Sequence, residues 1–185
     1  KFAFPKQRRS LLVPAKRRLE TITHPNNPPP VSPSGQGVLH NLHHLKNQRR
    51  DTAEHRRYSR LNKDFGKLTG YHFDVIATGD KLHLCFSLDD RTWHGAEDFG
   101  LGFHDLLLLL YLASTPKLEV LCIEEPETHL HPEIQRKALA YLADLPEPQV
   151  FLSTHSNIFL SDSSAKVLVT SYSENKVQLA DATER

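Results

Sequence analysis

The spacing of apolar residues divides the later part of the chain into recognisable elements. Across Tyr71–Leu88 apolar and polar positions alternate on both sides of Gly79-Asp80, which predicts a β-hairpin. Asp105–Ala113 is dense in leucine over a length that suits a helix, and such a segment is typical of core packing rather than of a membrane anchor. Leu118–Ile123 is a short continuous apolar run, which predicts a strand buried on both faces, as in a parallel sheet.

The pattern continues as helix and strand to the end of the chain. Pro132–Leu145 carries apolar residues at helical spacing and predicts a helix. Val150–Leu152 and Val167–Thr170 predict two further buried strands, and Val177–Leu179 predicts a short last one. Strand, helix and strand in this order predict an α/β fold in which β-α-β connections build a parallel sheet.

The first part of the chain has a different composition. Leu11–Ala15 is a short apolar run between basic residues and predicts a strand. His24–Gly37 holds five prolines with Asn, Ser and Gly, so it can continue neither a helix nor a strand ladder and is expected to be a loop. Val38–Lys67 lacks proline and repeats leucine at helical spacing, which predicts one long helix or two. We therefore expect a basic strand, loop and helical part over residues 1–70 and an α/β lobe over residues 71–185.

Charge separates the same two parts. Residues 1–70 hold 15 Lys and Arg against 4 Asp and Glu, whereas residues 71–185 hold 8 against 18. This division favours either an anionic partner or docking of the two parts on each other. No apolar stretch approaches the roughly 20 residues that span a bilayer. Cys85 and Cys122 lie in apolar runs, which favours free buried thiols in a reducing compartment and therefore a cytoplasmic protein.

Carboxylates follow the run Leu118–Ile123 directly. Glu124 and Glu125 stand at its carboxyl end, where ligands of open α/β sheets bind. Successive strand residues point to opposite faces, so one carboxylate can hold Mg²⁺ through water while the other deprotonates a water aimed at a phosphate. His155 follows the next strand, Val150–Leu152, and can reach a terminal phosphate in the same crevice. Two strands that merely end in polar residues are the simpler alternative, but both ends together, with one helix between them, favour the functional interpretation.

These residues resemble the motifs of one ATPase family. Ile123–Pro132 reads Ile-Glu-Glu-Pro-Glu-Thr-His-Leu-His-Pro, and with Leu152–Ser156 it is similar to the Walker B, D-loop and switch-histidine block of OLD-like AAA/ABC ATPases. Phe99–Leu107 resembles the signature segment of that family, in which a glycine-rich turn opens a helix. The resemblance implies an ABC-type P-loop ATPase lobe with a parallel-sheet core, a β-hairpin and a helical insert.

The resemblance also implies a role for each matching residue. Glu124 would be the Mg²⁺ ligand, Glu125 the general base and His155 the switch histidine. The residues expected to contact the nucleotide are Gly100, Leu101, Gly102 and Glu127. ATP and Mg²⁺ would lie at the interface of a head-to-tail homodimer, and hydrolysis would drive a DNA-related or antiphage-defence effector such as a nuclease. Leu101 stands where the family commonly has a small hydroxyl residue beside the glycines.

One essential motif of the family is missing from residues 1–185. A phosphate-binding loop needs Gly, four residues and then Gly-Lys-Ser/Thr, but Gly66-Lys67 is followed by Leu68, and Leu61 takes the place of the first glycine. Because the sequence starts at Lys1 and has no methionine, we expect an upstream segment to supply this Walker A motif. Residues 1–185 alone are then expected to be inactive. The alternative is a degenerate interaction or regulatory module that keeps the fold and binds no nucleotide.

Basic residues of the helical part suggest a DNA partner. The candidate phosphate contacts are Arg49, Arg50, Arg56, Arg57 and Arg60. A solvated helix face, or a surface docked on the acidic lobe, explains them equally well.

Other residues have structural explanations. His129 and His131 have no further ligands at metal-site spacing, so we expect them at a turn and at a helix start. Trp93 is expected to pack against the sheet rather than to stack on an adenine.

Overall fold

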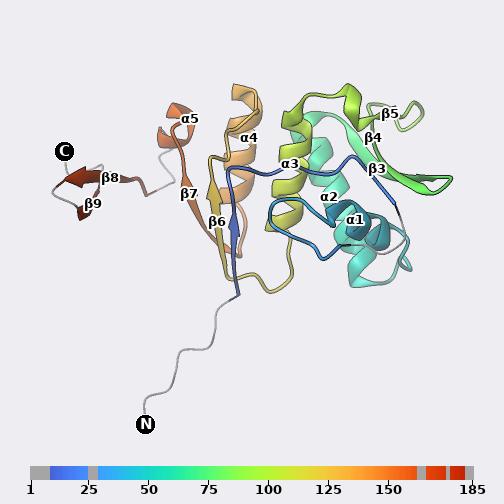
Figure 1. Ribbon diagram of the computed structural model, residues 1–185, viewed down its shortest axis with the longest axis horizontal. Coiled ribbons are helices and arrows are strands. Elements are labelled where there is room, and N and C mark those ends of the chain that lie inside the picture. Colours follow the sequence, from blue (N-terminus) through green and yellow to red (C-terminus); the bar gives the residue numbers. More distant parts are fainter. Residues whose placement is uncertain (1–8, 25–28, 162–165, 174–175, 182–185) are drawn as a thin grey trace, which may run out of the picture.

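The computed structural model describes residues 9–24, 29–161, 166–173 and 176–181, and a parallel sheet carries the acidic motif (Figure 1). Its strands are β1 (Ser10–Val13), β6 (Val120–Glu124) and β7 (Gln149–Ser153), ordered β1-β6-β7 and all parallel. Helix α4 (Pro132–Ala143) connects β6 to β7. The predicted β-α-β connection is confirmed, so β6 and β7 end at the same edge of the sheet.

A second, antiparallel sheet contains the predicted hairpin. β3 (His72–Thr78) and β4 (Lys81–Ser87) pair along their whole length, while β2 (Ile22–Thr23) and β5 (His94–Gly95) also pair with β4. The 3-10 turn η1 (Ala96–Asp98) follows. Strands from before residue 70 thus pair with strands from beyond it in both sheets. Cys85 on β4 and Cys122 on β6 are free, as expected, although Cys122 is only half-buried.

The helical part forms two helices, α1 (Val38–Lys46) and α2 (Ala53–Thr69). The break between them is local, because the Thr52 side chain accepts a hydrogen bond from the amide of His55 and so starts a new helix. Gly70, with φ 81°, ends α2 in the left-handed conformation that favours glycine. Residues 29–37 form turns before α1, as the prolines predicted.

Helix α3 (Leu101–Ala113) lies between the two sheets (Figure 1), and its residues His104–Ala113 are all buried. A cluster of aromatic rings packs between α2, the hairpin and the start of α3. The ring contacts join Tyr58, Phe65, Tyr71, Phe73, Phe86, Phe99 and Phe103. The predicted core role of the leucine helix is confirmed. No helix within the described residues is long and apolar enough to cross a membrane.

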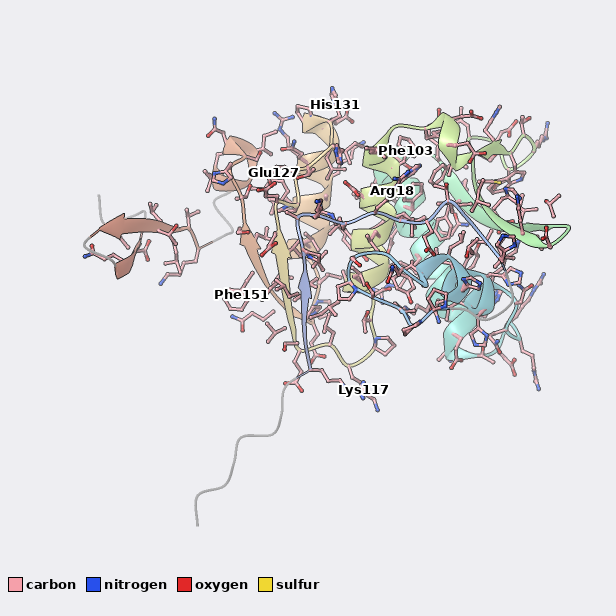
Figure 2. All side chains as sticks on the ribbon, in the orientation of Figure 1. Arg18, Phe103, Lys117, Glu127, His131 and Phe151 are labelled. Carbon is pink, nitrogen blue, oxygen red and sulfur yellow. The ribbon has the colours of Figure 1, made fainter. Side chains whose placement is uncertain are left out.

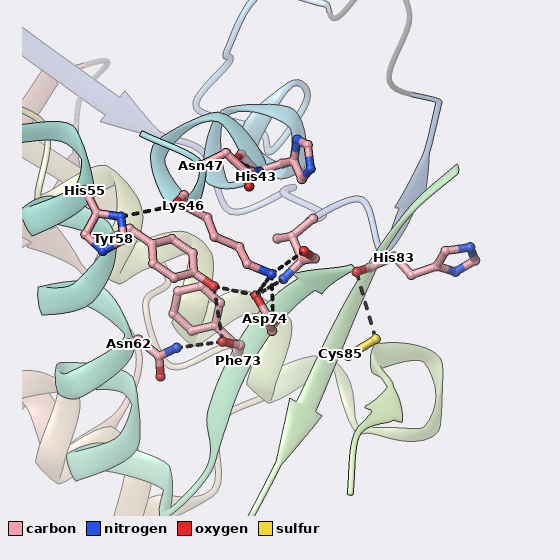
Figure 3. A network of polar contacts seen from close by, with 11 residues as sticks. His43, Lys46, Asn47, His55, Tyr58, Asn62, Phe73, Asp74, His83 and Cys85 are labelled. Carbon is pink, nitrogen blue, oxygen red and sulfur yellow. Dashed lines mark hydrogen bonds and ion pairs between the residues drawn. The ribbon is translucent and has the colours of Figure 1, made fainter. Parts of the chain in front are cut away.

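Polar contacts tie the helical part to the hairpin (Figure 3). The Lys46 Nζ donates to Asp74 Oδ2 at 2.8 Å and to the Val75 carbonyl at 3.0 Å, while the Tyr58 hydroxyl donates to Asp74 Oδ1 at 2.8 Å. Burial, followed by the Asp74 charge, raises the pKa of Tyr58, so its hydroxyl stays a donor. This network explains how α1 and α2 are held on β3.

Two strand predictions need correction. Val167–Thr170 is not a buried strand of the parallel sheet, because β8 (Leu168–Ser173) pairs antiparallel with β9 (Lys176–Asp181) in a separate two-stranded sheet. The Leu168 side chain is 51% exposed. A short apolar run fits either arrangement, and the strand nearest in sequence is the easiest partner to reach. Along β7, Phe151 is likewise 51% exposed rather than buried, since it lies on the uncovered face of the sheet.

Candidate functional site

The strand β6 delivers both predicted carboxylates to the edge of the parallel sheet. Glu124 is its last residue, and both Glu124 and Glu125 are exposed to solvent. Pairing with β7 continues one step further, because the amide of Glu125 donates to the Ser153 carbonyl at 2.8 Å. Glu125 then turns with φ 45°, a left-handed conformation that is uncommon for a residue with a side chain. Such outliers often occur at functional sites, where surrounding contacts must hold them.

The two carboxylates have different neighbours, although Glu125 lies just beyond the strand and its direction is set by the turn rather than by strand alternation. Glu124 Oε2 accepts a hydrogen bond at 3.1 Å from the amide of Ala15, which follows β1. The Glu125 side chain faces its own turn, where the Thr128 hydroxyl lies 3.5 Å from Oε2. Because Glu125 otherwise faces solvent, its carboxylate is available to a water molecule.

Glu127 links the acidic turn to the loop that carries His155. Its Oε1 accepts hydrogen bonds from the amides of His155 at 2.8 Å and of Ser156 at 3.1 Å. Its Oε2 is buried and has no hydrogen-bond partner among the described residues. The structure therefore brings His155 to the acidic turn, with its own side chain exposed. The resemblance implied a nucleotide contact for Glu127. In the structure the carboxylate of this residue, labelled in Figure 2, accepts the hydrogen bond from the His155 amide.

The glycine-rich turn packs against the same acidic segment. Gly100 precedes α3, and the Leu101 side chain is 48% exposed at the first turn of the helix. A Cβ at Gly102 would lie 2.5 Å from the His129 carbonyl oxygen, so the second glycine allows a close backbone contact. His129 Nδ1 also lies 2.8 Å from Asp105 Oδ2, one turn further along α3. This turn therefore has a packing role within one chain, besides any role toward a nucleotide.

His129 and His131 lie at a turn and at a helix start, as predicted, whereas Trp93 is only partly buried. His129 occupies a turn with φ 60°, and His131 caps α4 by accepting a hydrogen bond from the Glu133 amide at 3.4 Å. Within the described ranges no three His, Cys, Asp or Glu side chains gather as a metal site. Trp93 is half-buried and lines a cavity of about 530 Å³ beside Lys46 and Tyr58, apart from the acidic strand end.

Arg17 is the residue of this site that the sequence did not single out. It follows β1, is 8% exposed, and donates from Nη1 to the Glu124 carbonyl at 2.9 Å and from Nη2 to the Glu125 carbonyl at 3.1 Å. In the sequence, Arg17 could have been noticed only because it follows the predicted strand closely. Several other basic residues surround that strand, so its position alone did not distinguish it. Only the parallel pairing of β1 with β6 brings Arg17 to the carboxylates.

The candidate DNA-binding arginines divide into exposed and inward-facing residues. The Arg57 guanidinium donates to the Tyr111 carbonyl at 2.8 Å and to the Ser114 hydroxyl at 3.1 Å, and it lies over the Tyr111 ring. Arg57 therefore joins α2 to α3 and is not presented to a partner. The other four, Arg49, Arg50, Arg56 and Arg60, are exposed.

Comparisons of structure place this fold in a known class. A chain solved in work on ATP-driven dimerization and DNA-stimulated activation of SMC ATPases matches with a TM-score of 0.56 at 14% identity over 68% of this chain and 82% of that chain. The Smc head of Pyrococcus furiosus, solved with an extended coiled coil and the C-terminal domain of ScpA, matches with a TM-score of 0.55 at 16% identity over 71% of this chain and 36% of that one. The fold is that of ABC-type ATPase heads.

Sequence comparison gives the family. Residues 8–161 match the family described as "AAA domain, putative AbiEii toxin, Type IV TA system", so the chain belongs to that family of ATPase domains. An OLD nuclease of Thermus scotoductus (strain ATCC 700910 / SA-01) is 33% identical over 87 residues. That match covers 43% of this chain and 16% of the relative, so the chain spans a small part of the nuclease. The resemblance to OLD-like AAA/ABC ATPases is confirmed.

Proposed function

We propose that this chain supplies the hydrolytic half of an ATP site, in which Glu125 is the general base, Glu124 serves Mg²⁺ and His155 contacts the terminal phosphate. The observation that carries the proposal is the junction of two strand ends. Glu127 accepts from the amides of His155 and Ser156, so the histidine loop is held at the turn that presents both glutamates. A water molecule near Glu125 would lose its proton to that carboxylate as it attacks the phosphate.

The residues present fit Mg²⁺ in the manner of nucleotide sites. Mg²⁺ commonly keeps several waters and takes only one or two carboxylates plus phosphate oxygens. Glu124 offers one exposed carboxylate at the strand end, and the described residues contain no larger ligand cluster. When bound, the metal would neutralise charge that develops on the phosphates. Metal binding would therefore depend on the nucleotide.

The phosphate-holding part would come from outside residues 1–185. β7 pairs only with β6 among the described strands, so its other edge is open, and Phe151 (labelled in Figure 2) is exposed on the uncovered face of the same strand. Parallel strands are usually buried within a sheet, so the open edge of β7 suits a further parallel strand. A Gly-Lys-Ser/Thr loop at the end of such a strand would stand beside Glu125 and His155. A head-to-tail homodimer would then bring the turn at Gly100–Gly102 to the nucleotide of the other copy.

ATP turnover by the full-length protein tests the proposal. Glu125→Gln is expected to lower kcat by at least about 100-fold and to leave ATP binding intact, because the amide cannot take a proton. The matched control is Glu133→Gln, which alters an exposed glutamate at the start of α4. Undiminished turnover in Glu125→Gln would reject Glu125 as the base. A full-length protein that binds no ATP would instead favour the degenerate, non-catalytic module.

A second proposal concerns DNA as a partner. Arg56, Arg60, Lys63 and Lys67 are all exposed on α2 at spacings of four, three and four residues, which places them on one face of the helix. The stripe is about 16 Å long at 1.5 Å per residue. The buried Asp64 lies within the stripe, with its Oδ2 3.8 Å from Arg60 Nε and its Oδ1 3.5 Å from Lys67 Nζ. This single carboxylate offsets only part of the positive charge of the four residues. A row of four cations over about 16 Å can contact several phosphates of a DNA backbone. We propose a nuclease or defence effector as the protein that would act together with this surface.

Salt dependence of DNA binding separates this proposal from a merely solvated helix face. Replacing the four stripe residues by Gln should weaken duplex binding and reduce the slope of log K against log salt by up to about 4. The control is a set of four exposed lysines and arginines scattered over other elements, Lys81, Arg91, Lys117 and Lys166, also changed to Gln. Equal losses in the two sets, or no measurable duplex binding by the parent protein, would contradict a dedicated DNA surface.

A further inference from the structure

Arg17 occupies a position that only the fold explains. It lies in the loop after β1, its side chain is 8% exposed, and its guanidinium reaches across to the end of β6. The Nη1 group donates to the carbonyls of Glu124 at 2.9 Å and Pro14 at 3.3 Å. The Nη2 group donates to the Glu125 carbonyl at 3.1 Å. One rigid, planar group thus bridges its own loop and two consecutive peptide units of the acidic motif.

The two bridged peptide units are those where the strand gives way to the acidic turn. Glu124 ends the strand, and Glu125 adopts φ 45°, a left-handed conformation that is unfavourable for a residue with a side chain. The Glu125 carbonyl also accepts the Thr128 amide at 3.1 Å, so it is held from two sides. Hydrogen bonds from a charged donor are stronger than those from a neutral one and so can maintain this conformation.

The charge of Arg17 is balanced by acidic side chains around it. Burial lowers the pKa of the guanidinium, and the charges of Asp105, Glu127 and Glu125 oppose that shift. Asp105 lies on α3, and the other two carboxylates belong to the acidic turn, so Arg17 lies between the helix and the turn. Its Nε is buried and has no hydrogen-bond partner among the described residues, which leaves the two Nη groups as the anchors.

We infer that Arg17 is a positioning residue, whose forked guanidinium holds the Glu124 and Glu125 backbone so that the two carboxylates keep their separate directions. This inference rests on the proposed ATP hydrolysis. Arg17 itself touches main-chain carbonyls and no reacting atom. A lysine keeps the charge at this position but cannot bridge two carbonyls with a fixed planar fork, so Arg17→Lys removes the geometry selectively.

The test compares Arg17→Lys and Arg17→Gln with Arg18→Gln in the full-length protein. Arg18 is the exposed neighbour and serves as the matched control. Both Arg17 variants should lower kcat about 10- to 100-fold while the Kd for ATP changes by less than about 3-fold, because misplacing a catalytic group costs rate rather than binding. Hydrogen exchange should become faster at residues 124–130, including the Thr128 amide, and stay unchanged in α2.

A double-mutant cycle distinguishes positioning from general destabilisation. If Arg17 acts through Glu125, adding Arg17→Lys to Glu125→Gln should lower the residual kcat by less than about 3-fold. An equal further loss in that background, wild-type kcat in Arg17→Lys, or unchanged exchange at residues 124–130 would each overturn the inference. Undiminished turnover in Glu125→Gln alone would defeat the proposed function, whereas the exchange measurement would still report whether Arg17 holds the turn.

Discussion

The aromatic cluster and the acidic strand end are built on opposite principles. Phe65, Phe73 and Phe86 have no exposed surface, and their rings meet edge-to-face or stacked at 5.4 to 5.7 Å. Glu124 and Glu125, in contrast, are exposed and rely on hydrogen bonds between main chain and side chain. The first region stabilises the fold through buried apolar surface, and the second places a few polar groups accurately.

Because of this difference, we expect substitutions in one region to affect mainly stability and substitutions in the other to affect mainly activity. The acidic turn contains positive φ values at Glu125 and His129, whereas most rings of the aromatic cluster, including Phe65, Phe73 and Phe86, lie on regular helices and strands. Strained turns at sites cost stability that the core must supply. Substitutions in the cluster should therefore unfold the protein, and substitutions at the turn should impair the site before the fold.

The largest effect on stability is expected for Phe65→Ala. Phe65 contacts three other rings of the cluster, namely those of Phe73, Phe86 and Phe103. Its truncation should lower the free energy of unfolding by about 3–5 kcal/mol, because a cavity replaces a fully buried ring. Urea unfolding followed by circular dichroism measures the change. A loss under about 1 kcal/mol would contradict the role of the cluster as the stabilising core.

A smaller effect is expected for Gly102→Ala, which tests the contact between the glycine-rich turn and the acidic segment. The added Cβ would meet the His129 carbonyl oxygen at 2.5 Å, so the backbone must shift. We expect a loss of about 1–3 kcal/mol together with lower ATPase activity of the full-length protein. Gly100→Ala is the matched control for the stability measurement alone, since a Cβ there meets nothing within 4 Å. Equal losses of unfolding free energy in the two variants would show that the close contact is unimportant.

The smallest effect on stability is expected for Tyr141→Phe, which removes a hydrogen bond between α4, the helix after the acidic turn, and α2, the helix that carries Phe65. The Tyr141 hydroxyl on α4 donates to Asp64 on α2 at 3.4 Å, and burial followed by the Asp64 charge raises the pKa of Tyr141 to about 12. Its contribution is complete below the usual tyrosine pKa of about 10 and is lost as the pH rises toward 12. Tyr141→Phe should cost about 1 kcal/mol or less at neutral pH.

Urea unfolding of the wild type and Tyr141→Phe at pH 8 and pH 11 checks this expectation. The free energy of unfolding should fall less with pH in the variant, because the phenyl ring cannot ionise. Parallel pH profiles in the two proteins would show that Tyr141 does not link the regions in this way.

Local patterns were sufficient for the elements and for part of the site. The hairpin, the leucine helix and the strands around Glu124 and His155 follow from side-chain periodicity, which is a property of neighbouring residues. The same patterns misplaced Val167–Thr170, because a four-residue apolar run does not identify its pairing partner. They also grouped Arg57 with exposed arginines, although its guanidinium packs on Tyr111.

The amino-acid sequence by itself determined the α/β class, the order of the main helices and strands and the residues at both strand ends. Only the tertiary structure decided that Arg17 reaches the Glu124 and Glu125 carbonyls, that Glu127 holds the His155 loop, and that Gly102 lies against His129. Arg17 is 107 residues from Glu124 along the chain, and Glu127 is 28 residues from His155. Contacts over such separations arise from strand pairing and layer packing, whose geometry no local pattern of residues encodes.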